Sequence, residues 1–455
     1  MLLRSINPAT GELIGEYPET PFEEIEQRVQ WSNDAFQTWK KTPIRERVAL
    51  FTQLANALNK HNEPLAQLIT LEMGKTIREA RAEISKCEHL CRYYASNGEE
   101  FIAPKRIITE ASQSYVCYRP LGPILAIMPW NFPFWQVFRC AIPALTSGNT
   151  ILLKHAANVS GCSIAIEKLF KDSGFPEHVF QSLLITGQKV EVLINHRKIK
   201  GISLTGSTEV GRTVAQQAGR HLKKTVMELG GSDPYIILAD ADIDNAVQKS
   251  ISGRLLNAGQ SCIGAKRFII EENIYDSFVD RFVHSMRTAH MGNPLDENTQ
   301  IGPMARMNLR DDLHMQVIKS LDKGATLLTG GILPETSGYF YPPTVLADLR
   351  PGMPAWHEEL FGPVASIIKV KDHHEAVAIA NDTSFGLGSA IFTNNITLAQ
   401  KLAEEELDAG CCFVNDMVRS DPRLPFGGIN DSGYGRKLSR EGVLEFCNVK
   451  TIWIK

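Results

Sequence analysis

The chain has 455 residues, of which 43% are hydrophobic and 22% charged, a composition that excludes disordered, collagen-like and coiled-coil proteins. Its formal net charge is −3 and its basic runs are no longer than pairs, so a nucleic-acid or membrane-surface partner is not expected. The N-terminus has no signal-peptide pattern and no apolar run reaches about 18 residues, so we expect a cytoplasmic protein without a membrane anchor.

The first 90 residues have a helical pattern. Thr20 and Pro21 followed by Glu23 predict a helix start with a capping box. The apolar residues that follow at helical spacing predict a buried face: Phe22, Ile25, Val29, Phe36 and Trp39. Gly74 to Thr76 resembles the end of a phosphate-binding loop, but Ile69 stands where that motif requires its first glycine, so this interpretation fails.

The nine cysteines are odd in number and lack a compact spacing framework, which fits reduced thiols better than disulfides. Cys87, His89 and Cys91 could begin a zinc site, but no matching second pair of ligands follows them. We therefore predict no metal site, and one of the thiols is free to be reactive.

From Tyr115 onward, short apolar strands alternate with helical stretches, a pattern that predicts parallel strands joined by right-handed crossovers. A second series of such strands runs from Ser366 to Val414. Because a chain of this length exceeds a single hydrophobic core, the two series predict an α/β protein with two large lobes. We place the boundary between them near Leu238.

Cys262 stands in the segment GQSCIGAKR, where Gly259 and Gly264 allow the backbone to approach a ligand closely. A thiolate is the most nucleophilic side chain at neutral pH, so this residue is a candidate nucleophile. On this segment alone the alternative is stronger, because a free cysteine is commonly a small buried hydrophobic residue.

Asn131 lies between Pro129 and Pro133 at the end of a predicted strand. The two prolines fix the backbone, so the amide is held stiffly and could stabilise negative charge on a carbonyl oxygen. The alternative is a rigid turn in which the asparagine only caps the backbone.

Two further motifs suggest ligand chemistry only weakly. Gly206 to Gly211, GSTEVG, joins a predicted strand to a helix, and the helix N-terminus could bind a pyrophosphate, although the motif is not GxGxxG. Glu228 in MELGG has apolar neighbours that could make it a general base, but a solvated surface glutamate is the commoner alternative.

Taken together, the ordered motifs resemble the aldehyde dehydrogenase superfamily over nearly the whole chain, from INPATGE to the last strand. They are PWNFP, GSTEVG, MELGG, GQSCIGAKR, EELFGPV, NDTSFGLGSAIF and PFGGINDSGYGR. The resemblance implies an aldehyde-dehydrogenase-like α/β fold of two Rossmann-like parallel-sheet lobes with a small β oligomerisation element.

The resemblance also implies a role for each matching residue. Cys262 would be the nucleophile, Asn131 with the Cys262 backbone N–H the oxyanion hole, and Glu228 the base for the deacylating water. NAD or NADP would be held by Trp130, Lys154, Gly206, Ser207, Gly211, Leu229, Glu359 and Phe361.

The family organisation divides the chain into three parts. The dinucleotide-binding domain would comprise residues 1–111 and 124–237, and the catalytic domain residues 238–430. Residues 112–123 and 431–455 would form the oligomerisation element, because SYVCYRPLG and VKTIWIK alternate like strands that need an edge partner. We expect a homodimer, or a homotetramer built from dimers.

Cofactor choice depends on the third residue after Lys154, where many NAD-preferring relatives carry a glutamate that repels a 2′-phosphate. Ala157 occupies that position here. We therefore infer that NADP is tolerated, and the preferred cofactor stays open.

Arg139 lies eight residues after Asn131 and could hold a distal carboxylate by two charge-assisted hydrogen bonds. With WQVFR and KHAAN, this spacing resembles bacterial succinate-semialdehyde dehydrogenases of the Sad-like type. Leu256 stands where some of those enzymes carry a second arginine, so we favour Arg423 with Ser420 as the second anchor, ahead of Arg419. The alternative is that Arg139 belongs to a structural ion pair.

Other activities remain open at this stage. A broader aldehyde or glutarate-semialdehyde dehydrogenase would use the same residues, and a thiol esterase would need no cofactor. A non-catalytic binding protein is disfavoured, because Cys262, Asn131 and Glu228 are all present. The resemblance also implies hydrolysis to a free acid, because relatives that transfer the acyl group to coenzyme A usually lack the carboxylate that Glu228 supplies here.

Overall fold

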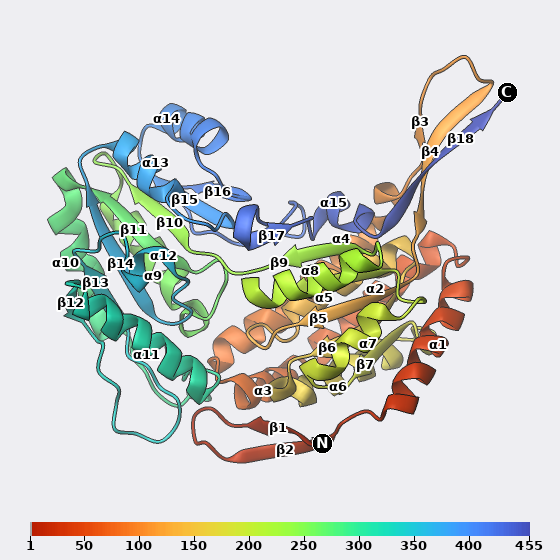
Figure 1. The fold of residues 1–455 in the computed structure, drawn as a ribbon, viewed down its shortest axis with the longest axis horizontal. Helices are drawn as coiled ribbons and strands as arrows, with labels where there is room; N and C mark the ends of the chain where they lie inside the picture. The colour runs from red at the N-terminus through yellow and green to blue at the C-terminus, as the bar shows by residue number, and fades with distance from the viewer. Residues whose placement is uncertain (1) are drawn as a thin grey trace.

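Two open α/β sheets, one in each lobe, organise the chain, and a small antiparallel sheet projects from one lobe (Figure 1). The computed structural model describes residues 2–455. Within that range no helix is both long and apolar enough to cross a membrane. The two-lobed α/β prediction is confirmed.

A hairpin that the sequence analysis did not predict precedes the N-terminal helices. Its strands β1 (Leu2–Ile6) and β2 (Leu13–Pro18) pair antiparallel. The helices that follow are α1 (Phe22–Trp39), α2 (Ile44–Lys60), α3 (Asn62–Met73) and α4 (Ile77–Phe101).

The helix over Phe22–Trp39 is confirmed, but its predicted capping box is wrong. Pro21 is the N-cap, and its side chain has no polar group that could cap the helix. The Thr20 hydroxyl does not cap it either, and instead accepts a hydrogen bond from the Leu184 backbone N–H at 3.2 Å. Phe22 is exposed, whereas the other apolar residues of the predicted face are buried. The real capping box joins Thr76 and Glu79 at the start of α4.

The first lobe is built on a six-stranded sheet whose strands are parallel except for β17 at one edge. Its spatial order is β17 (Gly433–Tyr434), β9 (Lys224–Glu228), β8 (Gly201–Thr205), β5 (Pro123–Met128), β6 (Thr150–His155) and β7 (Phe180–Leu183). The helices inserted between these strands are α5 (Trp135–Ser147), α6 (Ser160–Asp172), α7 (Val190–Asn195) and α8 (Thr208–Arg220).

Side-chain alternation along β5 explains why both faces of this sheet are covered. Ile124, Ala126 and Met128 join a core with α2 to α6, whereas Leu125 and Ile127 join a second core with α1, α7 and α8. A strand buried on both faces is the reason that its sequence is continuously apolar.

The second lobe is built on a seven-stranded sheet in which β12 alone runs antiparallel. Its order is β12 (Thr326–Thr329), β13 (Thr344–Ala347), β14 (Val364–Val370), β11 (Ala265–Glu271), β10 (Asp233–Ile237), β15 (Gly388–Phe392) and β16 (Cys411–Val414). Its helices are α9 (Ile243–Leu255), α10 (Glu272–Thr288), α11 (Met307–Asp322), α12 (Pro354–His357), α13 (His373–Asn381) and α14 (Ile396–Lys401).

The predicted boundary near Leu238 is wrong by one strand. β10, Asp233–Ile237, pairs with β11 and β15 of the second sheet, so the chain changes sheets between β9 and β10, over residues 229–232. The composition of a buried strand does not reveal which of two parallel sheets it enters.

The projecting sheet has the order β18 (Cys447–Ile454), β4 (Gln113–Pro120) and β3 (Lys105–Arg106), and the C-terminus lies at its tip (Figure 1). Residues 431–446 do not belong to this arm, although they were grouped with it. β17 extends the first sheet, and α15 (Ser439–Leu444) packs on α5. Short helical turns complete the chain: η1 (Ala157–Val159), η2 (Gly187–Lys189), η3 (Leu256–Gly259), η4 (Leu402–Glu406) and η5 (Asn430–Ser432).

In the first sheet the chain runs from β5 outward to β7 and returns on the other side of β5 with β8, so a topological switch point lies between β5 and β8. Ligands of open α/β sheets bind at the carboxyl ends of the strands beside such a point. The segment before β11 approaches this edge from the second lobe, which brings the predicted site residues together.

Candidate active site

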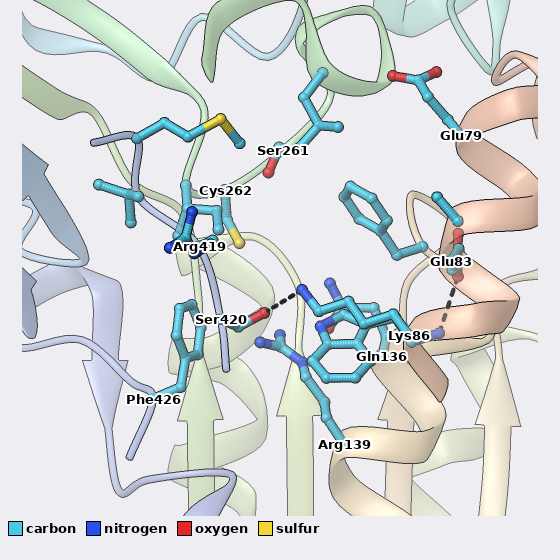
Figure 2. A pocket seen from close by; sticks show the side chains of 17 residues that line it. Glu79, Glu83, Lys86, Gln136, Arg139, Ser261, Cys262, Arg419, Ser420 and Phe426 are labelled. Atoms are coloured by element: carbon cyan, nitrogen blue, oxygen red, sulfur yellow. Dashed lines mark hydrogen bonds between the residues drawn. The ribbon is translucent and has the colours of Figure 1, made fainter. Parts of the chain in front are cut away.

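A cavity of about 200 Å³ lies between the lobes, and the Cys262 side chain opens into it (Figure 2). Helix α4 and the first turns of α5 form one wall, and the segments before β11 and around Ser420 form the opposite wall. Of the predicted site residues, Cys262, Arg139 and Ser420 line this cavity directly.

Contacts to backbone atoms fix the conformation of the Cys262 loop. The Lys266 ammonium donates to the carbonyl oxygens of Ser261 and Cys262, each at 2.9 Å. Gly259 has a φ of +73°, and a Cβ there would lie 2.2 Å from the Gly362 carbonyl oxygen, so only glycine fits. These contacts require a glycine at position 259 and fix the backbone from which the Cys262 side chain projects.

Burial raises the pKa of the Cys262 thiol to about 11, and the nearby cations Arg139 and Lys266 oppose that rise. The thiol is therefore protonated at neutral pH in this form of the protein. Attack on a carbonyl requires the thiol to lose its proton, and the surrounding cations Arg139 and Lys266 favour the thiolate form.

Asn131 approaches this loop from the end of β5. Its Nδ2 donates to the Gln260 carbonyl oxygen at 3.1 Å, and its own carbonyl oxygen accepts from Asn257 Nδ2 at 2.8 Å. An amide nitrogen carries two protons, so one N–H of Asn131 remains for a ligand oxygen. Asn131 therefore lies beside the cysteine loop, and only 4% of its surface is exposed to solvent.

Glu228 is the last residue of β9 and is buried in an ion pair with Arg139. The same carboxylate oxygen lies 3.3 Å from the Lys437 ammonium. Arg139 is thus engaged in the structural ion pair that was the alternative to substrate binding, although its side chain still lines the cavity. A guanidinium has five N–H donors, so one carboxylate does not use all of them.

The first-lobe residues predicted to hold a dinucleotide lie at or just beyond the carboxyl ends of β5, β6, β8 and β9. Ser207 is the N-cap of α8, directly after Gly206, and its hydroxyl accepts from the Val210 N–H at 3.4 Å. A Cβ at Gly211 would lie 2.5 Å from Leu229 Cδ2, so this glycine allows α8 to pack against the end of β9. The first backbone N–H groups of a helix have no partner within it, so the start of α8 suits a phosphate.

Lys154 supplies a test of whether a nucleotide fits. Its ammonium is partly buried at the end of β6, burial lowers its pKa, and it has no acidic partner among residues 2–455. A partly buried cation without a partner suits the hydroxyl or phosphate oxygens of a ribose. The residues present therefore fit the predicted cofactor.

Glu359 and Phe361 reach the same region from the segment before β14. The Glu359 carboxylate accepts from the Gly231 N–H at 3.0 Å and lies 3.4 Å from the Lys266 ammonium. Burial raises the pKa of Glu359, and these two donors oppose the rise. Phe361 packs edge to face on Trp130, with ring centroids 5.9 Å apart, so the predicted cofactor residues of the two lobes are in contact.

Arg423, the favoured second anchor, is not in the cavity. Its guanidinium binds both carboxylate oxygens of Asp421, at 2.9 and 2.7 Å, and its side chain is 70% exposed. That expectation is wrong. Arg419 lines the cavity but is paired with Asp416 at 2.7 Å.

Lys86 of α4 lines the cavity and was missed in the sequence analysis. Its ammonium donates to the Ser420 hydroxyl at 2.9 Å and lies 4.2 Å from the centroid of the Trp135 ring. Figure 2 shows the Lys86, Arg139 and Ser420 side chains converging below Cys262. The signal in the sequence was only a lysine within a helix, which is usually a solvated residue.

Among residues 2–455, no group of three or more histidine, cysteine or acidic side chains could hold a metal ion. Cys87 and Cys91 are buried on one face of α4, whereas His89 is exposed, so the histidine points away from the two thiols.

The model of the family described as "Aldehyde dehydrogenase family" matches residues 2–452. The chain is 47% identical to "Succinate semialdehyde dehydrogenase [NAD(P)+] Sad" of Escherichia coli (strain K12), over 99% of this chain and 97% of that protein. It is 44% identical to "Probable succinate-semialdehyde dehydrogenase [NADP(+)]" of Synechocystis sp., with both proteins fully covered. A solved succinic semialdehyde dehydrogenase from Streptococcus pyogenes, in complex with NADP+, superposes with a TM-score of 0.97 at 36% identity over 99% of each chain.

Proposed function

The chain belongs to the aldehyde dehydrogenase family, and from that premise we propose that it oxidises succinate semialdehyde to succinate with NAD or NADP. The observation that carries the proposal is the cavity in which the Cys262 thiol faces the cations Arg139 and Lys86. A semialdehyde has its reactive carbon at one end and a carboxylate at the other. Relatives at 43% to 47% identity are named for the same substrate.

In the first half of the reaction, the Cys262 thiol gives its proton to solvent water. The sulfur then bonds to the aldehyde carbon as the carbon–oxygen π bond breaks. Negative charge then develops on the former carbonyl oxygen. The free N–H of Asn131 Nδ2 and the Cys262 backbone N–H stabilise that charge, because donors fixed before reaction cost no reorganisation. The product of this step is a thiohemiacetal anion on Cys262.

The nicotinamide, when bound, supplies the acceptor for the hydride that leaves the thiohemiacetal carbon. Trp130, Phe361 and Glu359 would position the ring and its ribose. The adenosine and pyrophosphate ends would be held by Lys154, Gly206, Ser207, Gly211 and Leu229. Loss of the hydride leaves a thioester on Cys262.

In the second half, Glu228 takes a proton from the water that attacks the thioester, and the Cys262 sulfur leaves. In this structure the carboxylate is engaged by Arg139 and Lys437, so it must turn from that pair toward the cavity before it can reach the water. The ion pair therefore marks a resting position of the base.

The experiment that tests this function is a screen of semialdehydes and plain aldehydes with both nucleotides, followed at 340 nm by NAD(P)H formation. We expect the highest kcat/KM with succinate semialdehyde, and free succinate as product even when coenzyme A is present. Hydrolysis of esters without any nucleotide reduction would instead indicate a thiol esterase.

We propose that the arm mediates self-association. β18 and β4 pair along their whole length, but β18 is at the edge of its sheet and exposes Val449, Trp453 and Ile454. An edge strand with exposed apolar side chains is suited to a second copy of the chain. Light scattering should report a dimer or tetramer, and removal of residues 448–455 should give a monomer. The nine free cysteines agree with the expected cytoplasmic location, which stays a prediction.

A further inference from the structure

Lys86 is a partly buried cation that has no anionic partner in the part of the chain that the structure describes. Its ammonium contacts only a neutral hydroxyl, that of Ser420, and the face of the Trp135 ring. Charged groups taken out of water are normally paired, because an unpaired one is costly. The position of Lys86 in the cavity suggests that the missing partner is a ligand.

The carboxylates near Lys86 are all engaged elsewhere. Glu83, one turn earlier on α4, pairs with Lys75 and accepts from the backbone N–H groups of Phe134 and Trp135. Glu79 accepts from Thr76 and from the Asn257 N–H.

Asp421, next to Ser420 in the chain, is held by Arg423 through two hydrogen bonds. None of these three carboxylates therefore forms an ion pair with Lys86.

Arg139 does not supply the missing negative charge, and its own positive charge is already opposed by Glu228. That single carboxylate also faces Lys437, so two cations share one anion. With Lys86 added, the walls around the lower part of the cavity carry an excess of positive charge. An anionic ligand would correct it.

We propose that Lys86, assisted by the Ser420 hydroxyl, is the principal anchor for the terminal carboxylate of the aldehyde substrate. The inference rests on the proposed function and adds to it the residue that selects charged over neutral aldehydes. The ammonium donates to one carboxylate oxygen, and the hydroxyl turns from accepting a Lys86 hydrogen bond to donating one to the other oxygen. Arg139 adds its free N–H donors while it holds Glu228.

A titration distinguishes this role from a structural one. Burial, with a contribution from the Arg139 charge, lowers the pKa of Lys86 to about 8. The other titratable groups that face it are Glu83 and Cys87 on its own helix and Asp421 on the opposite wall, and these favour the ammonium. The KM for succinate semialdehyde should therefore rise above pH 8, and Lys86→Arg should abolish that rise because arginine stays charged.

The test compares Lys86→Met, Lys86→Arg and the control Arg92→Met, each assayed with succinate semialdehyde and with butanal. Arg92 is on the same helix but exposed, and it pairs with Glu88. Hydrogen bonds to charged groups contribute about 1.5 to 3 kcal/mol, so Lys86→Met should lower kcat/KM for the semialdehyde about 10- to 100-fold, mainly through KM. Butanal oxidation and the Arg92→Met variant should stay near wild type, and Lys86→Arg should recover most of the loss.

The outcomes separate the two proposals. If the wild-type protein does not prefer the semialdehyde over butanal, the proposed function fails. If it does prefer the semialdehyde and Lys86→Met keeps that preference, the function stands and the assignment of Lys86 is overturned. Equal losses on both substrates would also overturn it. Should Lys86→Met fail to fold, Lys86→Gln carries the same expectation with a polar side chain.

Discussion

Replacing Asn131 by alanine removes the side-chain half of the proposed oxyanion hole. The structure leaves one N–H of the Asn131 amide for a ligand, since the other is taken by the Gln260 carbonyl oxygen at 3.1 Å. Loss of one such donor costs about 2.7 to 4 kcal/mol in transition-state stabilisation, which corresponds to about 10²- to 10³-fold in kcat. The same change breaks the bond to Gln260 and a longer one from Gln136, at 3.4 Å.

Each of those two bonds contributes only about 1 kcal/mol to stability, against a usual total of about 5 to 15 kcal/mol, so the variant should fold. The assay is steady-state NADPH formation, combined with nucleotide binding measured by fluorescence. We expect kcat to fall about 10²- to 10³-fold, while the Kd for the nucleotide stays within about twofold of the wild-type value. Turnover near that of the wild type would refute the oxyanion assignment, and loss of nucleotide binding would show that the amide shapes the cofactor site instead.

Other expected outcomes follow from the same geometry. Cys262→Ser should lose aldehyde oxidation with an unchanged melting temperature, and retained activity would remove the thiol from the mechanism. Because the pKa of Cys262 is raised to about 11, alkylation of the nucleotide-free protein by iodoacetamide should keep accelerating from pH 7 to pH 10, whereas a plateau below pH 8 would contradict the buried thiol. Arg139→Met should slow butanal as well as succinate semialdehyde, since it strips Glu228 of its partner, and an effect on the semialdehyde alone would mean that the ion pair is dispensable. Ala157→Glu, at the turn after β6, should weaken NADP relative to NAD about tenfold or more by charge repulsion, and unchanged NADP kinetics would show that the 2′-phosphate binds elsewhere.

The sequence was sufficient for the lobes and for most of the residues around Cys262, because each motif follows a strand end or precedes a strand start. Parallel strands bring all their carboxyl ends to one edge, so Asn131, Ser207 and Glu228 had to gather wherever the strands were placed. What the motifs could not supply is which sheet a strand enters. That is why β10 was placed in the wrong lobe.

The sequence also did not reveal which side chains pair with one another. Arg423 was expected in the cavity because it lies near Ser420 in the chain, but the neighbouring Asp421 captures it locally. Arg139 was expected to hold a substrate carboxylate, with a structural ion pair as the alternative, and its ion-pair partner proves to be Glu228, which is distant in sequence. Lys86 was overlooked for the opposite reason, since nothing in a helical pattern distinguishes a solvated lysine from one that is desolvated against Trp135.

The central claim is that the Cys262 sulfur becomes covalently bonded to the substrate carbon. Its most direct test is mass spectrometry of the Glu228→Gln protein, quenched in acid after mixing with succinate semialdehyde and NADP. Because this variant cannot activate the deacylating water, we predict that the peptide containing Cys262 carries a succinyl thioester. An unmodified Cys262, or an acyl group on another of the nine cysteines, would contradict the account.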